Sequence, residues 1–212
     1  MSTVTHVKVC GITTIDDAGL AVRAGADAIG INLIPVSKRR VDPATARRIV
    51  QAVAGRITTV AVVADLPVAE LQRLRSETGV DLLQLHGNES PRVLEALLPH
   101  AYQALRVSTH ADVQRAADYG GDRILVDAKV EGQLGGTGVT FDWSLVRGLA
   151  RERRLVLAGG LSPDNVATAL AEVVPWGVDV ASGVEVSGEP RRKDGPRLQR
   201  FLAAVRAYRE SK

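Results

Sequence analysis

The chain has 212 residues, a length that fits one domain of the barrel type better than two small domains. Its net charge is only +3, its basic residues lie scattered beside acidic ones, and aromatic residues make up 3%, so we expect no nucleic-acid partner. No apolar run is long enough to cross a bilayer, which argues against a membrane partner.

The cysteine count and the first residues bear on the cellular compartment. Cys10 is the only cysteine, which excludes an internal disulfide and suits a reducing cytoplasm. Residues 1–6 lack the basic start and apolar stretch of a signal peptide. We therefore expect a cytoplasmic protein. No linker or composition shift divides the sequence, so residues 1–212 are predicted to form a single catalytic domain.

Short β-rich runs alternate with longer amphipathic segments along the whole chain. The predicted strands are His6–Cys10, Ala28–Ile34, Thr58–Val63, Leu82–Leu85, Gln103–Val107, Ile124–Asp127, Leu155–Ala158 and Val178–Val180. The predicted helices are 14–24, 43–54, 67–78, 91–98, 109–118, 142–150, 163–173 and 195–209. A strand–helix unit repeated about eight times is typical of the α/β class and predicts a closed parallel (β/α)₈ barrel.

A doubly wound open sheet is the structural alternative. It predicts a glycine-rich dinucleotide-binding turn after the first strand, whereas residues 10–13 read Cys-Gly-Ile-Thr.

Several helix ends are chemically marked. Asp42, Ser90 and Ser162 each precede a proline, which predicts an N-cap followed by proline at the first helical position. Gly25 and Gly79 stand where two of the helices should end.

Active sites of this barrel form at the carboxyl ends of the strands. The polar or small residues at those ends are Cys10, Asn32, His86, Asp127, Gly159, Gly160, Ser182 and Gly183. Side chains alternate along a strand, so Lys8 and Cys10 should point into the barrel while Val7 and Val9 face the helices. The same rule turns Asp179 inward on the eighth strand, where it can pair with Lys8.

Cys10 is a candidate general base. A lone cysteine is more often a small buried hydrophobic residue, but this one ends the first strand with Lys8 one step below it. A nearby cation lowers the pKa of a thiol, so we expect the pKa of Cys10 to move toward neutrality.

Asp127 is a candidate proton donor. It closes the apolar run Ile124–Val126, where a carboxyl group either caps the following loop or takes part in catalysis.

The loops after the seventh and eighth strands predict a phosphate site. They contain Gly159 and Gly160, and Ser182 and Gly183, whose small side chains leave backbone N–H groups free to face an anion. Gly136, within the run Gly135–Gly138, predicts a mobile lid or a backbone cradle over the substrate, or else a flexible connector.

His86 ends the fourth strand and either lines the pocket or makes a structural hydrogen bond, the preferred interpretation. The four histidines have no ligand spacing with one another or with acidic residues, so no metal site is expected.

Taken together and in order, these motifs resemble the phosphoribosylanthranilate isomerase family of tryptophan biosynthesis over nearly the whole chain. The motifs that carry the resemblance are Lys8–Thr13, Ser37–Arg39, Gln84–Gly87, Leu125–Lys129, Gly135–Gly138, Phe141–Trp143, Ala158–Leu161, Pro163–Val166, Asp179–Glu185 and Lys193–Asp194.

The resemblance implies an Amadori rearrangement of a small phosphorylated substrate without a cofactor. The family's catalytic cysteine and aspartate fall on Cys10 and Asp127, and its arginine after the second strand falls on Arg39. Asp127 would protonate the ribose ring oxygen, and Cys10 would remove the C2′ proton from the resulting Schiff base. Arg39 would hold the anthranilate carboxylate or steady charge. A monomer or a homodimer is expected.

Two departures from the family pattern affect the pocket walls. Residues 30–33 read Gly-Ile-Asn-Leu where a Gly-Phe-x-Phe run is usual, and Val62–Asp65 replaces a Phe-Val-Asn ending. Neither removes a catalytic group, so they concern substrate breadth more than reaction type.

Three alternatives stay open. The first is a histidine-pathway or dual-substrate sugar-phosphate isomerase on the same barrel, although those enzymes typically carry Asp where Cys10 stands. The second is a ribulose-phosphate epimerase, which needs metal-binding His and Asp residues that this sequence lacks. The third is a non-catalytic barrel that binds a phosphorylated ligand, which would need neither Cys10 nor Asp127.

Overall fold

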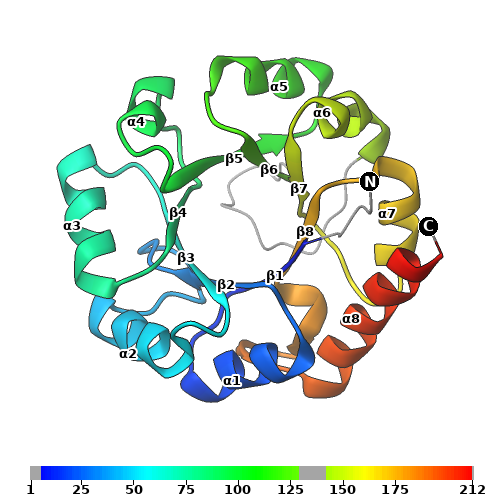
Figure 1. The fold of residues 1–212 in the computed structure, drawn as a ribbon, viewed down its shortest axis with the longest axis horizontal. Coiled ribbons are helices and arrows are strands. Elements are labelled where there is room, and N and C mark those ends of the chain that lie inside the picture. The colour runs from blue at the N-terminus through cyan, green and yellow to red at the C-terminus, as the bar shows by residue number, and fades with distance from the viewer. Residues whose placement is uncertain (1–5, 129–141, 212) are drawn as a thin grey trace.

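The computed structural model describes residues 6–128 and 142–211. Within them, eight parallel strands close into a barrel in chain order, and the helices form a ring outside it (Figure 1). The barrel closes where β1 pairs with β8, with Lys8 opposite Asp179 in the register. The predicted α/β fold, a (β/α)₈ TIM barrel, is confirmed.

The strands of the barrel are β1 (His6–Cys10), β2 (Ala28–Asn32), β3 (Thr58–Val63), β4 (Leu82–Leu85), β5 (Ala101–Val107), β6 (Arg123–Ala128), β7 (Arg154–Leu157) and β8 (Gly177–Val180). The α-helices are α1 (Ile15–Ala24), α2 (Pro43–Val53), α3 (Val68–Thr78), α4 (Pro91–Glu95), α5 (His110–Gln114), α6 (Arg147–Glu152), α7 (Val166–Val173) and α8 (Gly195–Glu210). The short 3₁₀ helices are η1 (Arg115–Asp118), η2 (Trp143–Val146) and η3 (Ser182–Val184).

Strand alternation divides the buried side chains into two sets. Val7 and Val9 on β1, like Val178 and Val180 on β8, belong to the apolar layer between the strands and the helices. A second, smaller cluster fills the barrel interior and consists of Ala28, Val60, Tyr102, Ala104, Leu125, Val156 and Ala158. The polar residues of alternate positions therefore project into the barrel, as predicted.

Most of the predicted strand ends lie within two residues of the observed ones. β2 stops at Asn32, before the predicted end at Ile34, because the Asn32 side-chain oxygen accepts the N–H of Ile34 at 2.9 Å and turns the chain. α4 ends at Glu95, short of residue 98, since a residue before a proline, here Leu98 before Pro99, is disfavoured in a helix.

The predicted helix ends have a mixed outcome. Asp42 caps α2 by accepting the N–H of Thr45 at 2.7 Å, and Gly25 and Gly79 end their helices in the left-handed conformation. Ser90 precedes α4 without a side-chain cap bond.

The prediction that Ser162 caps a helix from residue 163 is wrong. Asn165 accepts the N–H of Ser162 at 2.8 Å and donates to the carbonyl of Gly160 at 2.9 Å, so a turn takes up these residues and α7 begins at Val166.

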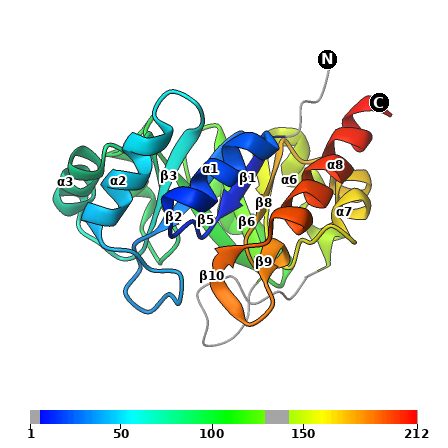
Figure 2. The ribbon, with the colours of Figure 1, turned by 90° about the horizontal axis from the view of Figure 1, so that it is seen from below.

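A β-hairpin that the sequence analysis did not anticipate lies between β8 and α8. Its strands are β9 (Glu185–Val186) and β10 (Glu189–Lys193), paired antiparallel around Gly188. Figure 2 shows the hairpin at the same end of the barrel as the loop between β2 and α2, opposite the carboxyl end of α8. Arg191 of the hairpin donates to the carbonyl of Arg40 in that loop at 2.8 Å.

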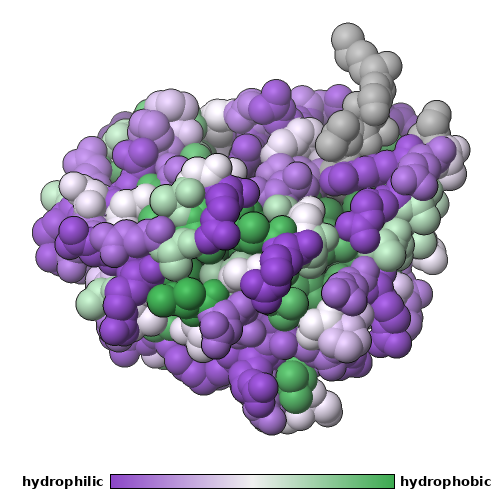
Figure 3. All heavy atoms as spheres, turned by 60° about the horizontal axis from the view of Figure 1, so that its bottom comes forward, coloured by the Kyte–Doolittle hydropathy of each residue, from purple (hydrophilic) through white to green (hydrophobic). Residues whose placement is uncertain are grey.

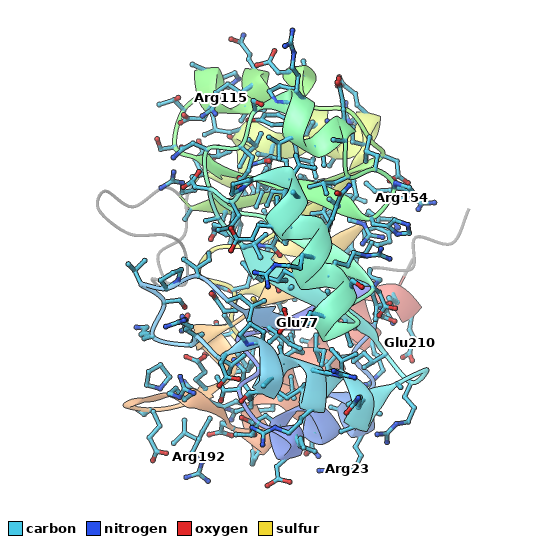
Figure 4. The ribbon with its side chains drawn as sticks, turned by 90° about the vertical axis from the view of Figure 1, so that its left-hand side faces the viewer. Arg23, Glu77, Arg115, Arg154, Arg192 and Glu210 are labelled. Carbon is cyan, nitrogen blue, oxygen red and sulfur yellow. The ribbon has the colours of Figure 1, made fainter. Side chains whose placement is uncertain are left out.

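The outer surface is mostly hydrophilic on the face shown in Figure 3, with apolar side chains between the charged ones. Charged residues of the helices, β10 and the start of β7 project outward, including those labelled in Figure 4, namely Arg23, Glu77, Arg115, Arg154, Arg192 and Glu210. None of the helices that the structure describes has the length and apolar character needed to span a membrane.

Candidate active site

A cavity of about 340 Å³ opens at the carboxyl ends of the barrel strands. It is lined by Cys10, Asn32, Ile34, Val36, Ser37, Lys38, Arg39, Val62, Gln84, His86, Asp127, Ala158, Gly159, Gly160, Leu161, Asp179, Ala181 and Ser182. The fold thus brings together most of the residues selected from the sequence. Gly183 lies beside Ser182 in η3, and Gly136 with the run Gly135–Gly138 lies outside the described residues.

Cys10 lies half-buried at the end of β1, directly above the Lys8–Asp179 ion pair, whose Nζ and Oδ2 are 2.9 Å apart. The pairing of Lys8 with Asp179 confirms the strand-alternation argument. The expected direction of the thiol pKa is wrong, however. Burial raises the pKa of Cys10 above its ordinary value, and the neighbouring ammonium group of Lys8 lowers it by less than burial raises it.

Asp127 is buried at the end of β6, with its Oδ1 accepting the N–H of Ala128 at 2.9 Å. Burial, helped by the negative charge of Asp179, raises the pKa of Asp127 to about 7. The hydrogen bond from Ala128 acts in the opposite direction. A carboxyl group with this pKa holds a proton near neutral pH, which a proton donor requires.

His86 is buried at the end of β4, between Gln84 and Asp127. Its Nδ1 lies 2.8 Å from Gln84 Nε2, and its Nε2 lies 3.6 Å from Asp127 Oδ2. Burial lowers the pKa of His86 to about 4, so the ring is neutral at physiological pH. The preferred expectation of a structural hydrogen bond fits Nδ1, while Nε2 faces the pocket beside Asp127.

The departures at Asn32 and Asp65 have separate consequences. Asn32 lines the cavity and ends β2. Asp65 instead ties the β3 loop to the β4 loop, since its Oδ1 accepts the N–H of Asn88 at 2.7 Å and its own N–H donates to Glu89 at 2.7 Å. Glu89 also accepts the N–H of Gly87 at 2.9 Å, which fixes the turn that follows His86.

Arg39 reaches the cavity from the loop after β2, and Glu185 of the hairpin holds it. Its Nε and Nη2 donate to the two carboxylate oxygens of Glu185 at 2.6 and 2.7 Å, and Lys193 Nζ donates to Glu185 at 2.9 Å. Both side chains of the Arg39–Glu185 pair are buried. A guanidinium group has five N–H donors, so this bidentate pair leaves others for a carboxylate in the pocket.

Close backbone packing explains the glycines at the phosphate end. A Cβ on Gly183 would collide with the carbonyl oxygen of Leu161, and a Cβ on Gly159 would lie 2.6 Å from the amide nitrogen of Ala128. The loops after β7 and β8 therefore touch each other through glycine. η3 supplies the short extra helix that often accompanies a phosphate site in this fold.

Sequence reasoning missed the contribution of the hairpin, because Glu185 and Lys193 belong to no predicted strand. The signal was present in the motifs Asp179–Glu185 and Lys193–Asp194, which carried the resemblance without a role for either charge. Among residues 6–128 and 142–211, no group of three or more His, Cys, Asp or Glu side chains could hold a metal ion.

Comparisons with known proteins agree over nearly the full chain. The family model described as N-(5′phosphoribosyl)anthranilate (PRA) isomerase matches residues 7–203. The N-(5′-phosphoribosyl)anthranilate isomerase of Pseudomonas aeruginosa (strain LESB58) is 45% identical over 206 residues, covering 96% of both chains. The enzyme of Geobacter sp. (strain M21) is 42% identical over 202 residues, covering 95% of this chain and 98% of its own.

Solved structures show the same similarity. The phosphoribosyl anthranilate isomerase of Thermotoga maritima superposes with a TM-score of 0.88 at 35% identity, covering 96% of this chain and 99% of its own. A complex of such an enzyme with reduced 1-(o-carboxyphenylamino)-1-deoxyribulose 5-phosphate gives 0.85 at 34% identity, with the same shares covered. Another structure, from T. maritima, contains monomers generated from the dimeric enzyme, with a TM-score of 0.85 at 34% identity and the same coverage.

Proposed function

The chain belongs to the N-(5′-phosphoribosyl)anthranilate isomerase family, and we propose that Asp127 and Cys10 are the acid and the base of its reaction. It is an aldose–ketose isomerase of tryptophan biosynthesis. The reaction is an Amadori rearrangement that converts N-(5′-phosphoribosyl)anthranilate into 1-(2-carboxyphenylamino)-1-deoxyribulose 5-phosphate.

Asp127 acts first, as a general acid. Its carboxyl proton passes to the ribose ring oxygen as the bond between C1′ and that oxygen breaks, and the anilino nitrogen forms a protonated Schiff base with C1′. The pKa of about 7 supports this role, because a general acid works best when its pKa lies near the operating pH, where about half of the molecules hold the proton to be donated.

Cys10 acts second, as a general base. Its thiolate takes the C2′ proton, and the electron pair forms the C1′–C2′ double bond of an enolamine while neutralising the Schiff base. Tautomerisation then removes the hydroxyl proton at C2′ and adds a proton to C1′, so protons balance over the reaction. The ammonium group of Lys8, which faces the thiol, favours the thiolate when it forms.

Arg39 and the loops after β7 and β8 position the substrate at its two ends. The guanidinium group, oriented by Glu185, binds the anthranilate carboxylate with its remaining donors. The backbone of Gly159, Gly160, Ser182 and Gly183 surrounds the phosphate. Arg39 and Gly159, Gly160 and Ser182 of these loops line the same cavity, so one molecule with two anionic groups can contact both sets of residues.

The observation that carries these roles is the placement of Cys10 and Asp127 in one cavity, at the ends of β1 and β6. The direct experiment follows the fluorescence of freshly made phosphoribosylanthranilate in parallel with the histidine-pathway substrate. We expect turnover of the former. Turnover of the histidine-pathway substrate alone would overturn the assignment.

The remaining features of the proposal concern the protein as a whole. We propose one catalytic domain in the cytoplasm, acting on a phosphorylated small molecule without a cofactor, as a monomer or a homodimer. The relatives include both dimeric and monomeric forms, so sedimentation of the purified protein decides between the two states.

A further inference from the structure

A chain of buried polar groups runs through the barrel interior from β5 to β6. The Tyr102 hydroxyl donates to Gln84 Oε1 at 3.0 Å, and Gln84 Nε2 lies 2.8 Å from His86 Nδ1. The three side chains are between 1% and 6% exposed. At the far end of the chain, His86 Nε2 lies 3.6 Å from Asp127 Oδ2.

The arrangement of these polar groups favours one tautomer of His86. Because the hydroxyl of Tyr102 occupies the carbonyl side of the Gln84 amide, the NH₂ side faces Nδ1 and donates to it. With the amide in this orientation, Nδ1 is the bare nitrogen of a neutral ring and Nε2 carries the hydrogen. Among the residues that the structure describes, this buried Nε2 has no hydrogen-bond partner within bonding distance.

An Nε2–H group has no lone pair, so it cannot take the proton of Asp127. It can only donate, and the acceptor it faces is Asp127 Oδ2, at a distance that a small movement of either side chain shortens to a hydrogen bond. The other carboxylate oxygen of Asp127 already accepts the N–H of Ala128. A second donor would stabilise the charge that appears on Asp127 when its proton leaves.

We propose that His86 is a positioning residue for the acid step, held by Tyr102 and Gln84 in the tautomer whose Nε2–H stabilises the ionised carboxylate of Asp127. This inference rests on the proposed function, because it concerns the carboxylate that remains after Asp127 has donated its proton to the substrate. It assigns His86 to the acid step through Asp127 and not to the phosphate or the anthranilate ring.

Other groups around Asp127 also shift the pKa of its carboxyl group, and a test by pH must take them into account. Asp179 on β8 raises the pKa of Asp127, whereas Lys8 on β1, Arg106 on β5 and the N–H of Ala128 lower it. Removal of a donor to the charged form raises the pKa of a carboxyl group. Loss of the His86 N–H should therefore move the titration of Asp127 to higher pH while those four groups stay in place.

The first measurement reads the tautomer without any turnover. The protein is labelled with ¹⁵N-histidine, and two-bond ¹H–¹⁵N correlations are recorded at neutral pH, with the His86 signals identified by their loss in His86→Gln. We expect a protonated Nε2 and a bare Nδ1. A ring protonated on Nδ1, or on both nitrogens, would overturn the proposal whatever the activity of Asp127 variants.

The second measurement compares His86→Leu with His86→Gln, whose amide N–H can replace that of Nε2, and with His110→Leu as an exposed control. We expect kcat of His86→Leu to fall about 10-fold to 100-fold with a smaller change in KM, because the lost donor serves a charged group. The pKa of the Asp127 carboxyl, followed by ¹³C NMR, should rise in His86→Leu and return toward the wild-type value in His86→Gln.

An unchanged carboxyl pKa in folded His86→Leu would refute the role of the N–H. If His86→Leu does not fold, Tyr102→Phe provides the same decision, since it removes the donor that orients Gln84. Both histidine tautomers should then appear in the NMR spectrum, with a lower kcat, whereas a spectrum identical to the wild type would overturn the proposal that Tyr102 and Gln84 hold the tautomer of His86. Full activity of Asp127→Asn would instead refute the proposed function and leave the tautomer result standing.

Discussion

The pH dependence of kcat/KM should show that the proton donor, Asp127, has a lower pKa than the general base, Cys10. We consider a change of pH, whose effect on the acid step depends on the pKa of about 7 for Asp127. At pH 7 about half of the Asp127 groups carry a proton, whereas a carboxyl group with an ordinary pKa of about 3.9 would do so in roughly one molecule in a thousand. The buried site therefore increases the acid form several-hundred-fold.

The thiol behaves in the opposite sense. Because burial raises the pKa of Cys10, only a minority of molecules carry a thiolate at pH 7. The productive form of the enzyme has a protonated Asp127 and an ionised Cys10. Because the pKa of Asp127 is lower than that of Cys10, only a small fraction of the molecules is in this form. Its fraction should rise about tenfold per pH unit below pH 7, stay level above it, and fall only beyond the pKa of Cys10.

The assay is kcat/KM from pH 5 to pH 10, measured from the loss of substrate fluorescence. The substrate phosphate titrates near pH 6, so the affinity of a product analogue is measured over the same range to separate binding from catalysis. We expect a bend at about pH 7 that is absent from the affinity profile. A level kcat/KM from pH 5 upward, with no bend near pH 7, would show that Asp127 has an ordinary pKa, and would refute the reasoning.

Three further predictions concern single substitutions. Asp127→Asn should fold and lose about 10²–10⁴-fold in kcat, the usual value of general acid catalysis, and a loss below about tenfold would reduce Asp127 to a loop cap. Gly183→Ala should raise KM about tenfold or more, because its Cβ collides with the Leu161 carbonyl beside the phosphate loops, whereas Gly148→Ala, in open space on α6, should leave KM unchanged. Glu185→Ala should lower the free energy of unfolding by about 3–5 kcal/mol in urea titrations, since it leaves the buried Arg39 without its carboxylate, and a loss below about 1 kcal/mol would contradict the pairing.

The fold was predictable because each level of the sequence pattern agrees with the others. Val7 and Val9 alternate with Lys8 and Cys10, so the direction of β1 and the pairing of Lys8 with Asp179 followed from the period of a strand. The caps at Asp42 and Gly25 are local chemistry and were also predictable. The turn at Ser162 was not, because Asn165 competes for the same backbone groups.

The electrostatics of the site were less predictable from the sequence. The order of residues places Lys8 beside Cys10, but it does not say how deeply the thiol lies, and burial reverses the direction expected for its pKa. The hydrogen bonds between Arg39 and Glu185 join residues 146 positions apart in the sequence. Glu185 belongs to a hairpin whose strands are only weakly indicated by the sequence. Contacts of this kind depend on the closed barrel and are absent from any local pattern.

The central claim, that Cys10 is the base that removes the C2′ proton, is tested most directly by the turnover of folded Cys10→Ala and Cys10→Ser. Neither side chain can accept a proton near neutral pH, so both variants should keep the far-ultraviolet spectrum and substrate-analogue affinity of the wild type while kcat falls about 10²–10⁴-fold. Near-normal kcat in either folded variant would remove Cys10 from the mechanism.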